Sequence, residues 1–230
     1  MAKLKDGSRV YGALTVDNAI IGNTGFQNMI LFTTGTAVVY TLPASLQVPG
    51  AKFKITVIGG GAGGATTAAT AGTTGSGGGA GGVVSIILQV ASVYTFTYTV
   101  GAAGASNLAG TLSSVVYNGV TYQASPGQPT GAGGAAAGVT NGTTLNGIGL
   151  TGFNGAPAGT NSSLQTGVAY GGDTPLGYGR GGRHGASTSS GSPGSAATGY
   201  GAGGSGGKNG STAAGQAGGA GAPGLIILQY

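Results

Sequence analysis

Residues 72–81, GTTGSGGGAG, place a glycine at every third position, and residues 201–210, GAGGSGGKNG, repeat that spacing. This spacing matches a polyproline II type helix, which has three residues per turn, and a stripe of glycine along it lets neighbouring backbones come close. Such a helix has no internal hydrogen bonds, so its backbone groups must pair with adjacent segments or with water. The spacing therefore predicts that several such helices pack side by side.

The composition excludes several classes of protein. Glycine supplies 55 of the 230 residues, and charged residues are 5% of the chain, whereas about a quarter is typical of a globular domain. The hydrophobic fraction of 40% is too high for a free disordered chain. There is no cysteine, hence no disulfide framework. Because each glycine costs roughly 0.5–1 kcal/mol relative to alanine, we expect oligomerisation to supply part of the stability.

The distribution of charge and hydropathy limits the kinds of partner that we expect for the protein. No run of eighteen apolar residues exists, and the first residues, MAKLKDGSRVYG, lack the apolar stretch of a signal peptide. We therefore expect neither membrane insertion nor Sec export. The net charge of +5 permits weak attraction to anionic surfaces but is sparse for nucleic acid, so no nucleic-acid partner is expected.

Composition divides the chain into three parts. Residues 1–25 form an N-terminal attachment or shaft segment, with Lys3, Lys5 and Arg9 interpreted as a solvated terminus and 10–16 as a strand. Residues 26–125 carry strand signals, and residues 126–224 are a glycine-rich distal insertion before a last strand at 225–230. The expected strands of the middle part are 29–33, 37–42, 52–58, 83–90, 94–100, 113–117 and 120–123, the last two joined by an Asn118-Gly119 hairpin turn.

These patterns predict an all-β fold, a β-sandwich of jelly-roll type with long glycine-rich loops. The terminal strand needs sheet partners, which residues 26–125 supply. The glycine spacing leaves two alternatives for residues 126–214, packed polyglycine or polyproline II helices and mobile loops. Collagen is rejected because the three-residue register shifts after Gly210 and the chain has only eight prolines.

One glycine pattern imitates a nucleotide site. Gly59, Gly61 and Gly64 fit G-x-G-x-x-G after an apolar strand, but no helix pattern follows and the next acidic residue is Asp173. Gly207-Lys208-Asn209 lacks the Ser or Thr and the earlier Gly of a phosphate-binding loop. We expect no nucleotide or other cofactor.

Residues for catalysis or metal binding are also scarce. Asp6, Asp17 and Asp173 are the only acidic residues, the first two far in sequence from the third, and His184 is the only histidine. A pair of catalytic carboxylates, a Ser-His-Asp triad and a transition-metal site are therefore all disfavoured, and His184 is interpreted as an exposed loop residue. We expect the protein not to be an enzyme.

One stretch of the glycine-rich insertion gathers aromatic and charged residues. Tyrosine offers a flat apolar face with a hydroxyl at its edge and arginine offers forked donors, which together suit sugars and phosphates on a surface. An alternative is that the tyrosines pack between glycine helices and the arginines only solubilise them. RNA binding through the single Arg-Gly-Gly-Arg motif is a weaker alternative. The candidate receptor-binding residues are Tyr170, Asp173, Tyr178, Arg180, Arg183, His184, Tyr200 and Lys208.

Three segments carry a resemblance to a known family. FTTGTAVVYTLPASLQVPGAKFKITVIGGGAGG (32–64), GSGGGAGGVVSIIL (75–88) with YTFTYTVGAAG (94–104), and GAGAPGLIILQY (219–230) are similar to the glycine-rich domains that end many bacteriophage tail fibres. DGSRVYGALTVDNAIIG, residues 6–22, is similar to short shaft segments of such fibres. The resemblance covers roughly residues 26–125 and 215–230.

The resemblance implies a homotrimer at the distal tip of a virion, made in the host cytoplasm. It would join other tail proteins through its N-terminus and bind a bacterial surface glycan or an outer-membrane protein through glycine-rich loops. Some phage adhesins that cap fibres are similar too and use packed polyglycine II helices. The alternatives are a structural glycine-rich surface or virion protein without a receptor role and, less favoured, a glycan-cleaving enzyme.

Overall fold

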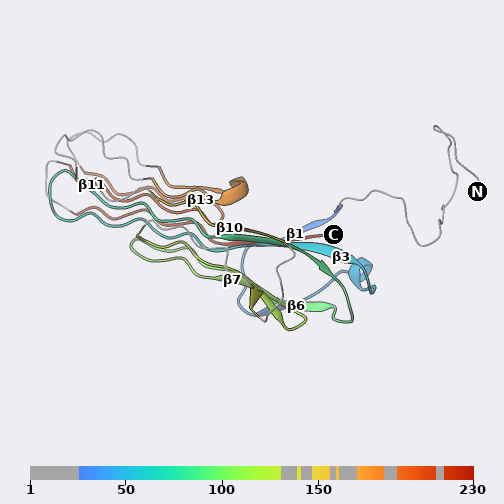
Figure 1. Ribbon diagram of the computed structural model, residues 1–230. Coiled ribbons are helices and arrows are strands. Elements are labelled where there is room, and N and C mark those ends of the chain that lie inside the picture. The colour runs from blue at the N-terminus through green and yellow to red at the C-terminus, as the bar shows by residue number, and fades with distance from the viewer. Residues whose placement is uncertain are drawn as a thin grey trace, which may run out of the picture.

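The computed structural model describes residues 26–130, 139–140, 147–155, 159–160, 170–183, 191–210 and 215–230. Two five-stranded antiparallel sheets face each other at one end of an elongated molecule (Figure 1). The first sheet has the order β1 (Met29–Phe32), β14 (Leu225–Gln229), β3 (Lys52–Ile58), β5 (Val83–Gln89) and β10 (Gly147–Leu150). The second has the order β2 (Val38–Thr41), β6 (Thr95–Thr99), β7 (Ser113–Tyr117), β8 (Val120–Ala124) and β9 (Val139–Thr140).

Alternating apolar side chains build the core between these sheets. Phe53, Ile55 and Val57 of β3 are fully buried, as the period of two in a strand requires. Phe53 meets Tyr117 of β7 edge to face, with ring centroids 5.3 Å apart, which joins the two sheets. The all-β prediction and the β-sandwich are thus confirmed.

The strand predictions agree with the structure in the described part of residues 26–125. Every expected strand there is present, with ends that differ by a residue or two, and the terminal strand β14 lies between β1 and β3. Asn118 and Gly119 both have positive φ, 49° and 76°, which is the type I′ geometry predicted for the β7–β8 hairpin. The predicted strand at 10–16 and the N-terminal segment lie outside the described residues.

The short elements were not predicted. Two-stranded ladders join β4 (Thr73–Thr74) to β11 (Gly159–Thr160) and β12 (Gly179–Arg180) to β13 (Thr198–Gly199). The only helical turns in the described residues are the 3-10 turns η1 (Ala44–Leu46) and η2 (Pro175–Gly177). No helix among the described residues is long and apolar enough to span a membrane.

Beyond the sandwich, long segments run side by side as wavy, nearly straight traces (Figure 1). We call the described residues 59–82, 101–111, 125–130, 151–155, 159–160, 170–183, 191–210 and 215–224 the glycine-rich block. The block therefore includes residues 59–82 and 101–111 in addition to the insertion expected from composition.

Backbone hydrogen bonds in the block repeat every three residues. Along residues 59–67, one face donates to residues 76–82, the next to 108–111 and the third to 216–222. The bonds to the first neighbour are Gly59 N–H to Gly82 O (3.0 Å), Ala62 N–H to Gly79 O (3.0 Å) and Ala65 N–H to Ser76 O (2.8 Å). A period of three is that of a polyproline II type helix, so the prediction that such helices pack side by side holds for these segments.

Carbonyl groups of the same segment accept from further neighbours. Ala62 and Ala65 accept from Gly204 and Gly207, each bond 2.9–3.0 Å long, while Gly61 and Gly64 accept from residues 104–107 and Gly60 from Gly127. The segment is thus bonded on all sides to other segments of the same chain. Its backbone polar groups find the partners that a lone polyproline II helix lacks.

Close packing explains where glycine is required. A methyl group on Gly61 would overlap the carbonyl oxygen of Ala202, and one on Gly64 would overlap that of Ser205. All residues of 59–64, 74–84 and 201–210 are buried, and these stretches contain glycine doublets and triplets. In 101–111, by contrast, only Gly101, Gly104 and Gly110 are buried. Dense glycine therefore marks interior segments, and one glycine in three marks a segment at the surface.

Ser113 at the start of β7 joins the sandwich to the block. Its hydroxyl is buried, donates to the carbonyl oxygen of Ile58 (2.6 Å) and accepts from the N–H of Gly101 (2.8 Å). Ile58 ends a strand and Gly101 begins a glycine segment. One side chain therefore fixes where two chain segments change from a period of two to a period of three.

Candidate functional site

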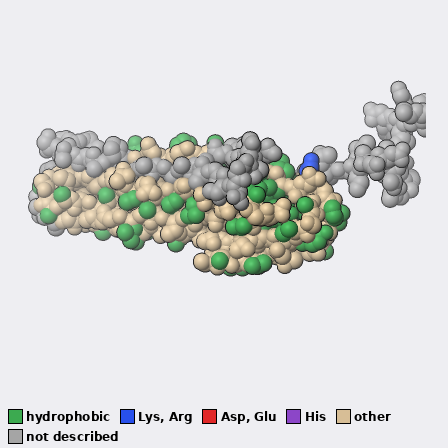
Figure 2. Space-filling view, turned by 60° about the horizontal axis from the view of Figure 1, so that its bottom comes forward, with side chains coloured by type: hydrophobic (Ala, Val, Ile, Leu, Met, Phe, Trp, Pro, Cys, Tyr) green, Lys and Arg blue, Asp and Glu red, His purple; other side chains and the backbone are tan. Residues whose placement is uncertain are grey.

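A cleft lies beside η2. The η2 turn is the orange coil in Figure 1, next to the sandwich. Its volume is about 440 Å³, which lies within the range of about 300–1,000 Å³ found for small-molecule sites. The face drawn in Figure 2, which brings the bottom of Figure 1 forward, shows mostly backbone, small polar side chains and scattered apolar ones, with little charge. The cleft is lined by Phe153, Asp173, Thr174, Leu176, Gly177, Gly179 and Arg180.

The η2 turn shapes one wall of the cleft. The side chain of Thr174 donates to the carbonyl oxygen of Tyr200 (2.5 Å), and its backbone N–H donates to that of Gly179 (3.0 Å). Pro175 is buried, while Leu176 is 66% exposed. Leu176 also has a φ of 63°, a left-handed conformation that costs a non-glycine residue roughly 1–2 kcal/mol. The chain thus holds an exposed leucine in an unfavourable backbone conformation at the mouth of the cleft.

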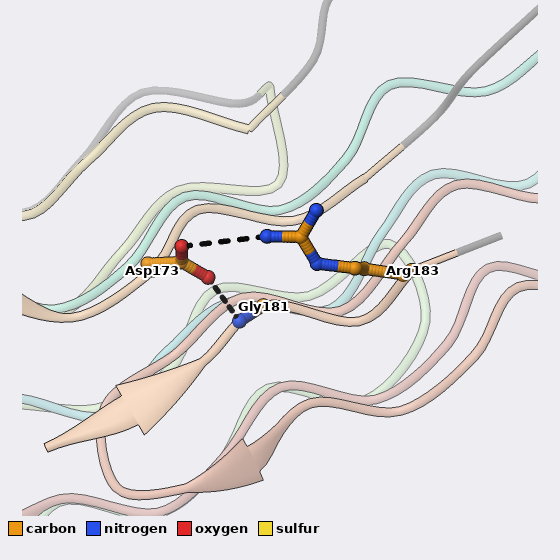
Figure 3. Close-up of polar contacts among 3 residues, drawn as sticks. All are labelled: Asp173, Gly181 and Arg183. Carbon is orange, nitrogen blue, oxygen red and sulfur yellow. Dashed lines mark hydrogen bonds and ion pairs between the residues drawn. The ribbon is translucent and has the colours of Figure 1, made fainter. Parts of the chain in front are cut away.

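Asp173 precedes η2 in the chain and Arg183 follows it, and their side chains lie close together (Figure 3). Asp173 Oδ1 accepts a hydrogen bond from the backbone N–H of Gly181 (2.7 Å), and Oδ2 lies 3.7 Å from Arg183 Nη2. The Arg183 side chain is 58% exposed and that of Asp173 46%. An exposed pair of this length contributes little to stability.

Arg180 is exposed on β12 and lines the same cleft as Asp173. Three of the candidate residues, Asp173, Arg180 and Arg183, are therefore brought to one side of the block. In the part of the chain that the structure describes, Asp173 is the only acidic residue. The lining thus carries one carboxylate and one guanidinium group, and Arg183 adds a second cation next to Asp173.

Tyr178 and Tyr200 pack instead on the outside of the first sheet. Both are half-buried against the small cluster of Ile58, Val83, Leu225 and Ile227, and Tyr200 N–H donates to Tyr178 O (3.0 Å). Both tyrosines therefore serve packing, but against strand residues and not between glycine helices as the alternative expected. They fix the position of η2 relative to the sandwich.

The remaining candidates are spread out. Tyr170 is exposed, and Lys208 is only 5% exposed, with backbone bonds in both directions to Ser192 (2.8 and 3.0 Å). Lys208 also forms a bridge to Thr74 of β4. It therefore lies inside the block and does not line the cleft. His184, like Asp6 and Asp17, lies outside the described residues.

The sequence did not single out Phe153, Thr174 and Leu176 as cleft residues. Phe153 is 58% exposed, and its carbonyl oxygen accepts from Ala80 N–H (3.0 Å), which ties it to an interior glycine segment. The available signal for the turn was a proline followed by a glycine, Pro175-Leu176-Gly177. The sequence around Phe153 gave no indication of a site, because its neighbours in the cleft come from a distant part of the chain.

The glycine-rich composition of the chain also agrees with its similarity to a known family. A family of glycine-rich domains matches residues 33–230, which spans the sandwich and the block. This chain belongs to that glycine-rich domain family. No curated protein matches the chain. The family match covers every described member of the cleft, so the site lies within the family's domain.

Proposed function

We propose that this glycine-rich protein is the receptor-binding protein of a bacteriophage tail fibre, located on the virion, which binds a bacterial surface glycan or an outer-membrane protein without catalysis. The observation that carries the proposal is the cleft beside η2, where exposed Phe153, Leu176 and Arg180 stand on a backbone-bonded scaffold. Apolar faces beside forked donors suit sugars.

The scaffold supports a role in recognition because it limits the entropy lost on binding. The cleft residues lie on segments bonded to the interior of the block, as at Gly172, whose N–H donates to Gly78 O (2.9 Å). A site held in its bound geometry avoids part of the ordering cost that a mobile loop would incur. Weak single sites then suffice if several act together.

Avidity is the role we assign to a homotrimer. Three linked sites can exceed the affinity of one by about 10² to 10⁴. The described glycine segments pair their backbone groups within one chain, so these hydrogen bonds do not require a second chain. The trimer and the attachment to other tail proteins through the N-terminus therefore rest on the resemblance to tail fibres.

A structural surface or virion protein without a receptor role is the second candidate. It is favoured by the placement of Tyr178, Tyr200 and Lys208, which contribute to packing and not to the cleft. In that case the block would supply only rigidity, and the cleft would have no ligand.

Adsorption to bacterial cells separates these candidates. We would label the full-length chain with a fluorophore, incubate it with a panel of Gram-negative and Gram-positive strains, and measure bound protein by flow cytometry. The proposal predicts saturable binding to some strains, reduced by Arg183→Ala and unchanged by Lys52→Ala, which removes an exposed charge from the sandwich. Absence of saturable binding across the panel would favour the structural role. Release of oligosaccharide from host polysaccharide would instead indicate an enzyme.

A further inference from the structure

We infer that the cleft beside η2 binds an anionic saccharide, a sugar ring that carries a carboxylate or a phosphate group. This inference rests on the proposed function and specifies the ligand of that site. The charges, the apolar wall and the backbone conformation of the cleft each support it separately.

The charges of the cleft select an anion. Among the described residues, the other cations are Lys52 and Lys54 on the sandwich and the buried Lys208, so Arg180 and Arg183 are the only exposed cations of the glycine-rich block. Asp173 lies 3.7 Å from Arg183, and its other oxygen is engaged by the N–H of Gly181. Arg180 lines the cleft and has no ion pair among the described residues, so a ligand with a negative group would balance its charge. Arginine donates two parallel hydrogen bonds to a carboxylate or a phosphate.

The apolar wall of the cleft selects a ring. Phe153 and Leu176 are both more than half exposed, and both line the cleft with Arg180. The C–H faces of a sugar ring pack on such side chains, and its hydroxyls reach polar groups at the rim. A simple inorganic anion would leave these two side chains in water.

The backbone at Leu176 indicates that the wall is built for a ligand. A φ of 63° would suit glycine, and Gly177 at 74° stands next to it. The turn nevertheless presents a leucine, which no described contact of the fold requires because the side chain is exposed. An exposed apolar residue in a strained conformation, in a cleft that Arg180 also lines, is the kind of feature that clusters at ligand sites.

Binding of defined polysaccharides to the full-length chain tests this inference. The probes are polygalacturonate, which carries carboxylates, a phosphate-bearing teichoic acid, and neutral dextran as the uncharged reference, each titrated by isothermal calorimetry. We expect binding to one of the two anionic polymers and none to dextran. The polymer that binds decides between carboxylate and phosphate.

Four variants separate a specific site from general attraction between opposite charges. Arg180→Ala should weaken binding about tenfold, Arg180→Lys less, and Lys52→Ala should leave it unchanged. Leu176→Gly should also weaken binding but leave the thermal midpoint equal or higher, because glycine accepts this φ. Equal losses for Arg180→Ala and Lys52→Ala, or equal binding to dextran, would overturn the inference.

The same variants distinguish the failure of this inference from the failure of the proposed function. If Arg180→Ala and Leu176→Gly adsorb to cells as the parent chain does, the protein is an adhesin but the cleft is not its receptor site. If the chain binds an anionic polymer but adsorbs to no strain, the cleft binds a ligand of the inferred class but the proposed receptor role fails. Loss of adsorption after protease treatment of the cells, with no polymer bound, would point to a protein receptor and overturn the saccharide assignment.

Discussion

Phe53 in β3 and Gly61, a short distance further along the same chain, are both buried but for opposite reasons. Phe53 fills the space between two sheets, whereas Gly61 is buried because it leaves no space to fill. Around Phe53 the chain packs side chains at a period of two. Around Gly61 it packs backbones at a period of three.

The two regions therefore respond to opposite changes. A sandwich loses stability when a buried side chain becomes smaller, since apolar contact is lost and a cavity is left. A glycine bundle loses stability when a buried residue becomes larger, since the neighbouring carbonyl oxygen must move and its hydrogen bond with it. The four predictions below test this difference, beginning with the largest effect.

Truncation in the sandwich should have the largest effect. Phe53→Ala removes a fully buried ring that meets Tyr117 at 5.3 Å, and we expect a loss of about 3–5 kcal/mol in the free energy of unfolding. Urea unfolding measures this value. Val39→Ala, at an exposed position, is the control and should change stability by less than about 0.5 kcal/mol.

Enlargement in the block should have the next largest effect. Gly61→Ala drives a methyl group into the carbonyl of Ala202, and we expect a loss of about 3 kcal/mol. The matched control is Ala220→Ser, which also adds one atom but at an exposed position of a surface segment. If urea unfolding gave equal stability for both variants, the close approach of the backbones would not be a source of stability.

Loss of the junction hydroxyl should have an intermediate effect on both regions. Ser113→Ala removes the partners of the Gly101 N–H and of the Ile58 carbonyl oxygen, both in a buried site, and we expect a cost of about 2 kcal/mol. Hydrogen exchange should rise at the start of the 101–111 segment as well as at the end of β3. Faster exchange at only one of these places would show that the serine does not couple the regions.

A change of pH should have the smallest effect and should act on the sandwich. Burial raises the pKa of Tyr122 above the ordinary value for tyrosine, with a further contribution from Tyr117. The neutral form is favoured in the folded state, so this stabilisation is present below about pH 10 and is lost as the pH rises through the raised pKa. Urea midpoints measured from pH 9 to 12 should fall less steeply for Tyr122→Phe. An unchanged slope would contradict the assignment.

The strands of the sandwich could be predicted because side chains carry the information. β3 and β7 begin and end at the predicted residues, since β-branched and aromatic residues alternate and the flanking residues favour turns. β10 was missed because Gly147–Leu150 contains only two apolar residues between glycines. Its antiparallel pairing with β5 stabilises it as a strand, although its own sequence gives little indication of one.

The glycine-rich block could be predicted only in part. The spacing at Gly72, Gly75, Gly78 and Gly81 predicted helices with three residues per turn. Glycine has no side chain, however, so the sequence does not indicate which segment lies beside which. For the same reason the cleft could not be assembled from the sequence. Asp173 and Arg180 were named as candidates because they are close in sequence, and Phe153 was missed because only the packing of segments brings it to the cleft.

The most direct test is amide hydrogen exchange of the full-length chain, followed by NMR. Gly61, Gly64 and Gly78 donate across segments to Ala222, Gly219 and Gly204 in bonds of 2.8–2.9 Å. The account predicts that these glycine amides are protected to about the degree of the buried amides of β3, since both are paired within one cooperative fold. If the glycine amides exchanged at the rate of an unstructured peptide while those of β3 stayed protected, the backbone-bonded bundle would be contradicted.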